Sequence, residues 1–459
     1  TIHHWVKLVT IYSTIPVLAV VLHWWRPIIF ERIEGMGNKN AVLAWVTKHP
    51  SGALAYPAAA LGASYLLLRA VYRILRGYLG GYDLVRRALA YWFRRELSKQ
   101  NEAKTADDMQ PLAGAPYEAF DPAQSAMVIV PSVADPELDD IIRRIDLPGG
   151  GVFAIVGERG AGKSSLLRRI QESCRTRLID CPEHVETFFA QLREAYDLPR
   201  DADQAGLVEA LEQLGDDTAL LIDDAHHLIR PKIGGLDDFE RLLELARLSS
   251  VQACTWVFCL DAVIWQYFEQ ARGARPLFDD VIALSPWSEE GITRLLRQRT
   301  EAAGMKPRFD RLLREHELGG DATERRQSLH RAELNYYRLL WDYANGNPGV
   351  ALQFWRDSLC IDDEDRCWVR LFEPPSTSDI ESLPEEAIFV LRAVVQLERA
   401  RVADIAAATM LTESRIRDAL RYALARGYVA TEAGRYRVEW RWFRAITSVL
   451  QRRHLLTTR

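Results

Sequence analysis

"VFAIVGERGAGKSSLLRRI", residues 152–170, decides the fold of the central part of the chain. Its first five residues are apolar, as in a buried strand, and its last residues have the apolar period of an amphipathic helix. Between them lies the pattern GxxxxGK[ST], in which glycines let successive backbone N–H groups surround phosphate oxygens at the start of the helix. The stretch therefore predicts a strand, a phosphate-binding loop and a helix. A chance match in a glycine-rich turn is the alternative, which the agreement of strand, loop and helix disfavours.

The predicted nucleotide site combines this loop with the end of a second strand. Lys163 is expected to reach the β- and γ-phosphates, and Ser164 to bind Mg²⁺. In "TALLIDDAHHL", residues 218–228, an apolar run ends at Asp223, which is placed to hold the metal, and Asp224, which is placed to orient the attacking water. Two acidic residues that cap an ordinary buried strand are the alternative. The predicted cofactors are ATP and Mg²⁺, and the loop residues predicted to contact them are Gly157, Glu158, Arg159, Gly160, Ala161, Gly162, Lys163, Ser164 and Ser165.

Length and composition indicate a modular folded protein. A chain of 459 residues is expected to divide into two or three domains. With 48% hydrophobic and 26% charged residues, the composition argues against wholesale disorder and a fibrous repeat. The six cysteines form no CxxC pair and have no histidine partner at zinc spacing, which predicts reduced thiols.

Charge is distributed unevenly along the chain. Residues 1–99 carry a net charge of +9 and residues 384–459 one of +6, whereas the whole chain carries −5. The region between them is therefore strongly acidic. Such segregation suggests that one or both ends meet anionic lipid or nucleic acid; alternatively, charge merely follows composition.

The N-terminal region has the pattern of a membrane hairpin. Residues 8–25 and 51–68 are runs without Lys, Arg, Asp or Glu, each nearly long enough to cross the hydrocarbon core of a bilayer. The first run ends in a Trp pair, and a basic stretch follows the second, which predicts a cytoplasmic flank. The expected localisation is therefore the inner (cytoplasmic) membrane, with another membrane protein as partner. A signal peptide and a buried soluble hairpin are the alternatives.

Five motifs occur in a characteristic order between residues 130 and 360. They are "VFAIVGERGAGKSSLLRRI", "LLIDDAHHL", "WVFCLD", "VIALSPWSEEGITRLLRQRT" and "YANGNPGVALQFW". In this order they resemble the AAA+/STAND class of P-loop ATPases. The resemblance implies a parallel sheet with strand order 5-1-4-3-2, helices on both faces and a helical lid. It also implies that Gly346, Asn347 and Pro348 form the lid element that contacts the nucleotide base.

Two further positions follow from that resemblance. Asp261 stands where relatives usually carry the Asn or Thr that senses the γ-phosphate, which is a departure from their pattern. Arg275 resembles an arginine finger presented to a neighbouring subunit, with Arg272 as the fallback; a finger implies a homo-oligomeric ring or stack. A merely solvated arginine is the alternative. The predicted catalytic residues are accordingly Asp224, Lys163 and Arg275.

Asp224 favours slow hydrolysis. Processive AAA+ motors usually carry Glu at this position, and the shorter Asp side chain is expected to orient the attacking water less well. Paired Asp residues are also what STAND switches use. We therefore predict a slow ATPase that acts as a nucleotide switch.

The C-terminal region is predicted to be a winged helix. From Glu385 onward the pattern is helix, helix, turn, longer helix, a strand pair around Ala433 and Gly434, and a last helix. Arginines on the third helix and on the wing are suited to DNA phosphates, but acidic residues lie among them. Packing on the ATPase core or on a partner is therefore the preferred interpretation, and nucleic acid is the less favoured partner.

Together these patterns predict an α/β protein. Its parts are a transmembrane helical hairpin (1–75), a basic juxtamembrane helix and linker (76–125), a P-loop (ASCE-type) core with a parallel sheet (126–300), a helical lid (301–375) and a winged helix (376–459). The favoured function is a membrane-anchored ATP switch that regulates or assembles with a membrane complex, such as a channel or envelope complex. A membrane-tethered DNA-binding regulator and a ring-forming assembly motor are the alternatives.

Overall fold

The structure is a computed structural model, and all of its described residues belong to one part of the chain. The chain divides into two compact units, Thr1–Glu96 and Leu97–Arg459. The predicted membrane hairpin and juxtamembrane helix lie outside the described residues. The structure describes residues 110–112, 119–122, 141–143, 150–173, 176–199, 203–212, 219–250, 254–273, 277–313 and 321–456.

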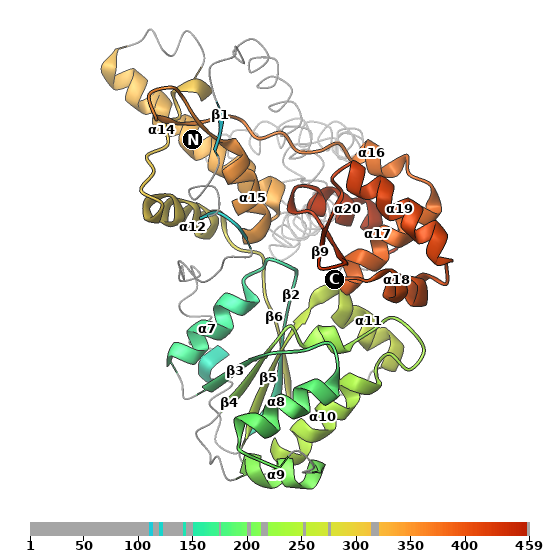
Figure 1. The fold of residues 1–459 in the computed structure, drawn as a ribbon. Coiled ribbons are helices and arrows are strands. Elements are labelled where there is room, and N and C mark those ends of the chain that lie inside the picture. The colour runs from blue at the N-terminus through green and yellow to red at the C-terminus, as the bar shows by residue number, and fades with distance from the viewer. Residues whose placement is uncertain are drawn as a thin grey trace, which may run out of the picture. The chain divides into compact units, whose positions relative to one another are not determined.

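A five-stranded parallel sheet forms the centre of what we call the sheet domain, residues 150–284 (Figure 1). Numbered along the chain within this sheet, the strand order is the 5-1-4-3-2 that the resemblance implied. The central strands are buried on both faces, which is why they are continuous apolar runs in the sequence. In sheet order the strands are β3 (Thr176–Asp180), β4 (Ala219–Asp223), β5 (Thr255–Asp261), β2 (Gly151–Gly157) and β6 (Asp280–Ala283).

Helices cover both faces of the sheet. Along β2, Val152, Ala154 and Val156 belong to one hydrophobic cluster and Phe153 and Ile155 to another, as the alternation of side chains along a strand requires. The first cluster includes side chains from α8 (Val185–Ala195), α9 (Gln204–Glu212), α10 (Asp237–Ser250) and α11 (Ala262–Arg272). The second includes side chains from α7 (Lys163–Ser173). The predicted α/β class is thus confirmed.

The lid, residues 285–372, is a helical layer with a small hairpin. Because α12 packs with the other lid helices, the lid begins before the predicted boundary at residue 300. Its elements are α12 (Glu289–Ala302), η3 (Asp310–Leu312), α14 (Ala322–Ala344), α15 (Pro348–Ser358), β7 (Leu359–Ile361) and β8 (Cys367–Val369).

The C-terminal module, residues 376–456, shares one hydrophobic cluster with the lid. Its helices and its antiparallel strand pair follow the order that the sequence predicted, while the winged-helix assignment itself stays a prediction. Since the two parts share a core, we treat the lid and the module as one packed body. The module consists of α16 (Thr377–Glu381), α17 (Glu385–Leu397), α18 (Val402–Thr409), α19 (Glu413–Ala425), β9 (Val429–Glu432), β10 (Arg435–Val438) and α20 (Trp440–Arg452).

A segment expected to be a linker is part of the lid. β1 (Gln110–Pro111) pairs antiparallel with β7, and Leu112 and Phe120 are buried in the lid cluster. The side chain of Arg299 on α12 donates a hydrogen bond to the backbone oxygen of Ala119 at 3.2 Å. A strand of two residues is too short to produce a sequence period, which is why this attachment was not predicted.

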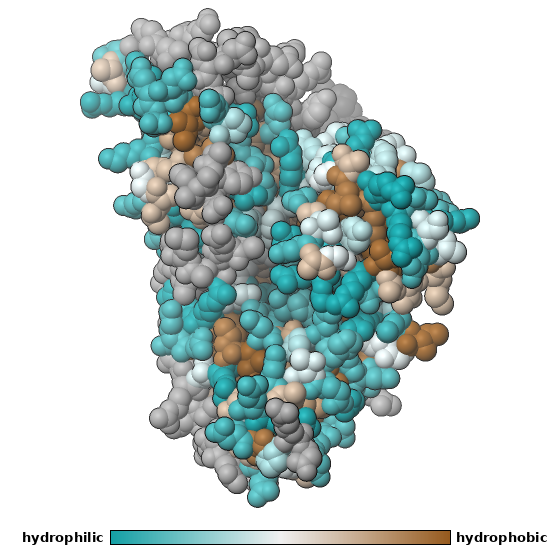
Figure 2. All heavy atoms as spheres, viewed as in Figure 1, coloured by the Kyte–Doolittle hydropathy of each residue, from teal (hydrophilic) through white to brown (hydrophobic). Residues whose placement is uncertain are grey.

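The expected localisation at the inner membrane is contradicted. Within the part of the chain that the structure describes, no helix is long and apolar enough to cross a bilayer. The longest described helix, α14, carries seven Asp, Glu or Arg residues, and the face seen in Figure 2 is largely hydrophilic. The two uncharged runs that suggested the membrane lie outside the described residues. The predicted membrane localisation is therefore wrong, and the membrane partner stays a prediction.

Candidate nucleotide site

The carboxyl end of β2 positions the predicted phosphate-binding loop. The strand ends at Gly157, and α7 begins at Lys163, so the loop connects a buried strand directly to a helix N-terminus. Gly160 and Gly162 have φ angles of 79° and 100°, in the left-handed region that favours glycine. The backbone conformation therefore explains why glycine stands at these two positions.

Lys163 lies at the centre of the site. Its side chain is buried, and Nζ donates hydrogen bonds to the backbone oxygens of Gly157 (2.9 Å) and Glu158 (3.2 Å). Burial by itself lowers the pKa of an ammonium group, but the negative charges of Asp261 and Glu398 outweigh it and raise the pKa of Lys163. The site thus holds a positive charge where the sequence predicts a contact with phosphates.

Ser164 and Asp223 lie together as a candidate Mg²⁺ pair. Their side chains are hydrogen-bonded, and Asp223 also accepts a hydrogen bond from the backbone N–H of Asp224 at 3.0 Å. Burial and the charge of Asp224 raise the pKa of Asp223. A divalent cation would offset this repulsion, and hydroxyl and carboxylate oxygens are ligands that Mg²⁺ prefers, so the two residues fit the metal.

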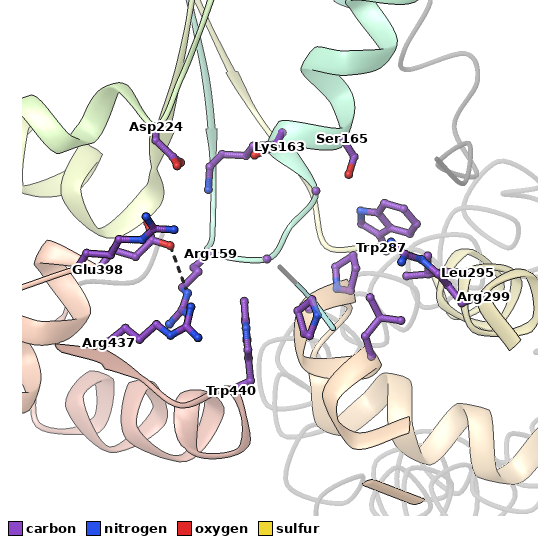
Figure 3. Close-up of a pocket in the computed structure, with 18 residues that line it drawn as sticks. Arg159, Lys163, Ser165, Asp224, Trp287, Leu295, Arg299, Glu398, Arg437 and Trp440 are labelled. Atoms are coloured by element: carbon purple, nitrogen blue, oxygen red, sulfur yellow. Dashed lines mark ion pairs between the residues drawn. The ribbon is translucent and has the colours of Figure 1, made fainter. Parts of the chain in front are cut away.

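A cavity of about 220 Å³ opens beside these residues (Figure 3). The sheet domain contributes the loop, Lys163, Ser164, Ser165 and Asp224. The lid contributes an apolar side from Trp287, Leu295 and Pro348, and the C-terminal module adds Glu398, Arg399, Arg437 and Trp440. The cavity is therefore charged at the loop and partly apolar at the lid, as a nucleoside polyphosphate requires.

A comparison with protein families identifies this part of the chain. The model of the AAA domain family matches residues 147–268, which include the phosphate-binding loop and both acidic residues at the end of β4. The chain contains an AAA-type P-loop ATPase domain. The match leaves out only the edge strand β6 of the sheet, and we use the name AAA domain for the sheet domain from here on.

Solved structures of similar fold are distant. The Aeropyrum pernix ORC2 protein is 14% identical with a TM-score of 0.34, covering 76% of this chain and 100% of that one. Cdc6 from Pyrobaculum aerophilum is 16% identical with a TM-score of 0.32 and the same coverage of both chains. A STAND protein with a tetratricopeptide repeat sensor from Pyrococcus horikoshii is 14% identical with a TM-score of 0.31, covering 72% of this chain and 47% of that one. These values are too low to support a conclusion about function, and no match was found among curated proteins.

The C-terminal module contacts the phosphate-binding loop of the AAA domain through two opposite charges. Glu158 accepts hydrogen bonds from both terminal nitrogens of Arg444, at 3.2 and 3.1 Å. Nε of Arg159 lies 3.3 Å from the Glu398 carboxylate, and Nη1 donates to the backbone oxygen of Val438 at 2.9 Å. The module therefore contacts both of these charged residues of the nucleotide-binding motif.

Trp440 of α20 fills the space between the loop and the lid. The guanidinium carbon of Arg159 lies 4.3 Å from the centre of its ring. A Cβ atom on Gly160 would lie 2.6 Å from the ring, and one on Gly349 of α15 would lie 2.8 Å from it. Both positions have room only for glycine while α20 packs here.

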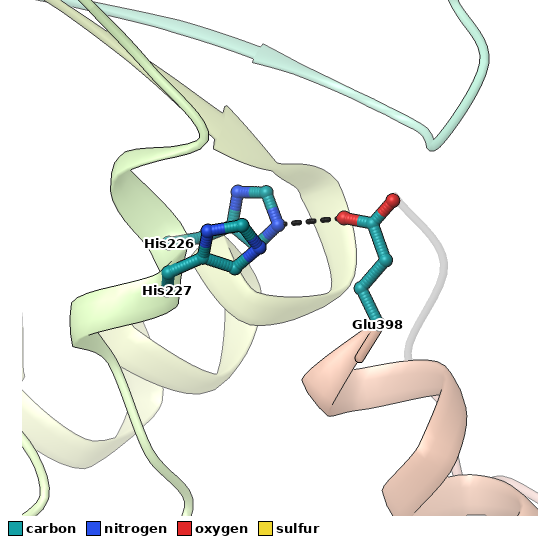
Figure 4. Close-up of side chains that lie close together, drawn as sticks. All are labelled: His226, His227 and Glu398. Carbon is teal, nitrogen blue, oxygen red and sulfur yellow. Dashed lines mark hydrogen bonds and ion pairs between the residues drawn. The ribbon is translucent and has the colours of Figure 1, made fainter. Parts of the chain in front are cut away.

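His226, which follows the end of β4, contacts the same Glu398 carboxylate as Arg159. Its Nε2 lies 2.7 Å from the Glu398 carboxylate (Figure 4). Burial alone would lower the pKa of His226, but the hydrogen bond and charge of Glu398 raise it. With His227 these groups have ligand atoms within 4.8 Å, a spacing that suggests a metal site. We interpret the group as an ion-pair network instead, because the guanidinium of Arg159 contacts the same carboxylate.

The lid element Gly346–Pro348 lies beside the phosphate-binding loop, and its contact with the nucleotide base stays a prediction. Asn347 caps α15, and its amide donates hydrogen bonds of 2.8 Å to the Glu158 carboxylate and to the backbone oxygen of Arg159. Pro348 lines the cavity, and Gly346 has a φ of 70°. The lid therefore contacts the phosphate-binding loop directly.

Two of the remaining predicted residues, Asp261 and Arg272, do not line the cavity. Asp261 caps α11 by accepting a hydrogen bond from the backbone N–H of Val263 at 2.8 Å, and burial raises its pKa. Arg272 forms an ion pair of 3.4 Å with Glu240 inside the chain. Arg275 lies outside the described residues, so its role as a finger stays a prediction.

The residues of the C-terminal module that line the cavity or contact the loop were not predicted to do so. Glu398, Arg444 and Trp440 come from a region whose sequence pattern suggested DNA or packing, and their contacts join residues up to 286 positions apart. The available signal was in the loop: Glu158 and Arg159 are charged at motif positions that accept any residue.

Proposed function

We propose that the chain is a slow, nucleotide-controlled switch in which docking of the C-terminal module on the phosphate-binding loop depends on the nucleotide. The observation that carries the proposal is the pair of contacts Glu158–Arg444 and Arg159–Glu398. They involve the loop that is expected to surround the phosphates, so nucleotide binding and module docking act on the same residues.

The character of this interface supports a reversible contact. The lid and the module share an apolar core, to which the AAA domain adds Val263 of α11, whereas the module meets the loop mainly through ion pairs, hydrogen bonds and one tryptophan. When such partly buried ion pairs separate, both charges regain water, which offsets much of the lost attraction, whereas exposure of an apolar core has no such compensation. The lid and module are therefore suited to move as one body relative to the AAA domain.

The residues of the AAA domain divide the chemistry of ATP hydrolysis among them. Lys163 binds the phosphates, and Ser164 with Asp223 holds the metal. Mg²⁺, when bound, neutralises charge on the β- and γ-phosphates. Asp224 lines the cavity and is proposed to orient the attacking water. The Asp side chain is one methylene shorter than that of Glu and orients the water less well, which supports slow turnover.

The alternatives from the sequence find less support. Arg415, Arg417 and Arg421 form ion pairs with Glu386, Glu413 and Asp418 of their own module, respectively. On the strand pair, Arg435 pairs with Glu183 of the AAA domain, and Arg437 lines the cavity. The acidic partners offset the positive charge of this surface, which makes it less suited to DNA phosphates, so we do not favour the DNA-binding regulator. A ring-forming motor depends on Arg275 and has no further support.

The test is nucleotide binding and turnover by the purified chain and by Lys163→Ala. Loss of a charged hydrogen-bond donor is expected to weaken ATP binding by roughly tenfold to a hundredfold. Lys306→Ala, at an exposed lysine of the lid, serves as the control and is expected to bind as the wild type does. Turnover is expected well below about 1 s⁻¹. Unchanged ATP binding by Lys163→Ala, or turnover of tens per second, would contradict the proposal.

A further inference from the structure

We propose that Glu398 acts as a resident anion at the phosphate end of the nucleotide site, so that the docked module admits a nucleoside diphosphate but must yield to the terminal phosphate of a triphosphate. The inference concerns the regulation of the site described above and rests on the proposed function. It assigns to one carboxylate of the C-terminal module the discrimination between the two nucleotides.

The first observation is the place of Glu398. It follows α17 directly, and its carboxylate reaches across to His226 (2.7 Å) and Arg159 (3.3 Å) of the AAA domain. About a quarter of the side chain, 23%, stays exposed, and the residue lines the cavity beside the loop (Figure 3). The charge therefore faces the space that a nucleotide would occupy.

The second observation is the backbone that holds it there. Glu398 has φ 56° and ψ −48°, and the N–H of Arg399 bonds to the oxygen of Leu397, which makes a γ-turn centred on Glu398. This turn is rare and strained for a residue with a side chain, and such strain persists where the surroundings enforce it. Here it directs the carboxylate into the AAA domain instead of letting the helix end in an ordinary cap.

The third observation is the set of cations around the carboxylate. Arg159 and His226 contact it, Arg399 and Arg437 line the same cavity, and Lys163 lines the cavity as well. Burial lowers the pKa of Arg159, and the neighbouring Arg437 adds to this effect while Glu398 opposes it. Positive charges this close together repel one another unless an anion lies among them, and in the docked state Glu398 is that anion.

A terminal phosphate would compete for the same cations. It is itself anionic, and the cavity already holds the carboxylate of Asp224 next to Asp223. Like charges that share a partly desolvated cavity repel each other strongly. Entry of a γ-phosphate therefore requires Glu398 to leave, whereas a diphosphate ends before that point. Withdrawal of Glu398 breaks its contacts with Arg159 and His226, which links the identity of the nucleotide to docking.

The test compares the affinities of the full chain for ADP and for a non-hydrolysable ATP analogue with Mg²⁺. Glu398→Gln is expected to tighten binding of the ATP analogue by about tenfold or more while changing ADP binding by less than about threefold. Glu398→Asp keeps the charge on a side chain that is shorter by one methylene. It is expected to raise the affinity for the ATP analogue, but by less than Glu398→Gln does. The matched control is Glu386→Gln on α17, the helix that Glu398 follows. It removes an exposed carboxylate paired with Arg415 of α19 and is expected to change neither affinity.

The outcomes separate this inference from the proposed function. If the wild type binds both nucleotides and the ratio of their affinities is the same in all four proteins, Glu398 does not discriminate and the inference is overturned. If the Gln variant does not fold, the Asp variant decides in the same way. If the wild type binds neither nucleotide, the proposed function fails and this inference fails with it.

Discussion

At the scale of single residues, the phosphate-binding loop holds the C-terminal module in addition to its predicted contact with phosphate. Glu158 and Arg159 stand at motif positions that the chemistry of phosphate binding leaves unrestricted, and both are taken up by contacts with the C-terminal module. Arg444 is largely buried and also donates to the backbone oxygen of Ala344 at 2.7 Å. Removing one partner of such a contact leaves the other charge poorly solvated. The contribution of the contact is therefore measured by swapping the two charges, singly and together.

We predict that the charges of the first contact are interchangeable. Arg444→Glu places two carboxylates together and is expected to lower the free energy of unfolding by about 1–3 kcal/mol, and Glu158→Arg is expected to do the same with two cations. The double variant is expected to recover a large part of the loss. Thermal unfolding of the four proteins measures the coupling; a double variant that equals the sum of the two single losses would show that the contact contributes nothing.

At the scale of elements, α20 packs against two glycines from different parts of the chain. Gly160 belongs to the loop and Gly349 to the first turn of α15, and the N–H of Gly349 bonds to the oxygen of Gly160 at 3.1 Å. Trp440 lies against both. The packing therefore joins the loop, the lid and the module at one point.

We predict that Gly349→Ala destabilises the chain although it favours a helix. Glycine to alanine in a helix ordinarily stabilises by about 0.5–1 kcal/mol. Here the new Cβ would meet Trp440, and we expect a net loss of roughly 1 kcal/mol in the free energy of unfolding. In a Trp440→Ala background, the same change is expected to become neutral or stabilising. An equal effect of Gly349→Ala in both backgrounds, measured by denaturant unfolding, would rule out this packing as the cause.

The sequence predicted the elements that carry local patterns. The loop, β4 with its acidic pair and the order of the C-terminal helices follow from glycine spacing, apolar runs and helical period. Contacts between distant segments have no such pattern, so Glu398, Arg444 and Trp440 were not placed at the site, and β1 was too short to recognise. The membrane localisation depended on two uncharged runs outside the described residues and was wrong by the finding on the described helices.

At the scale of the whole described unit, the division of the core explains how a nucleotide would act. The clusters on the two faces of the sheet belong to the AAA domain, and a third cluster joins the lid to the C-terminal module. A conformational change at the loop is therefore expected to displace the lid and the module together. The β1 segment is paired with the lid strand β7 and therefore belongs to the same body.

The measurement that tests the central claim most directly is the distance between the AAA domain and the C-terminal module. Spin labels at Lys232→Cys and Met410→Cys, both exposed positions, are suited to it, with Cys174 replaced by Ser and the described native cysteines buried. We predict one short distance with ADP, and an added longer population with a non-hydrolysable ATP analogue and Mg²⁺ that is absent from Lys163→Ala. An identical distance distribution with ADP and with saturating ATP analogue would contradict the account.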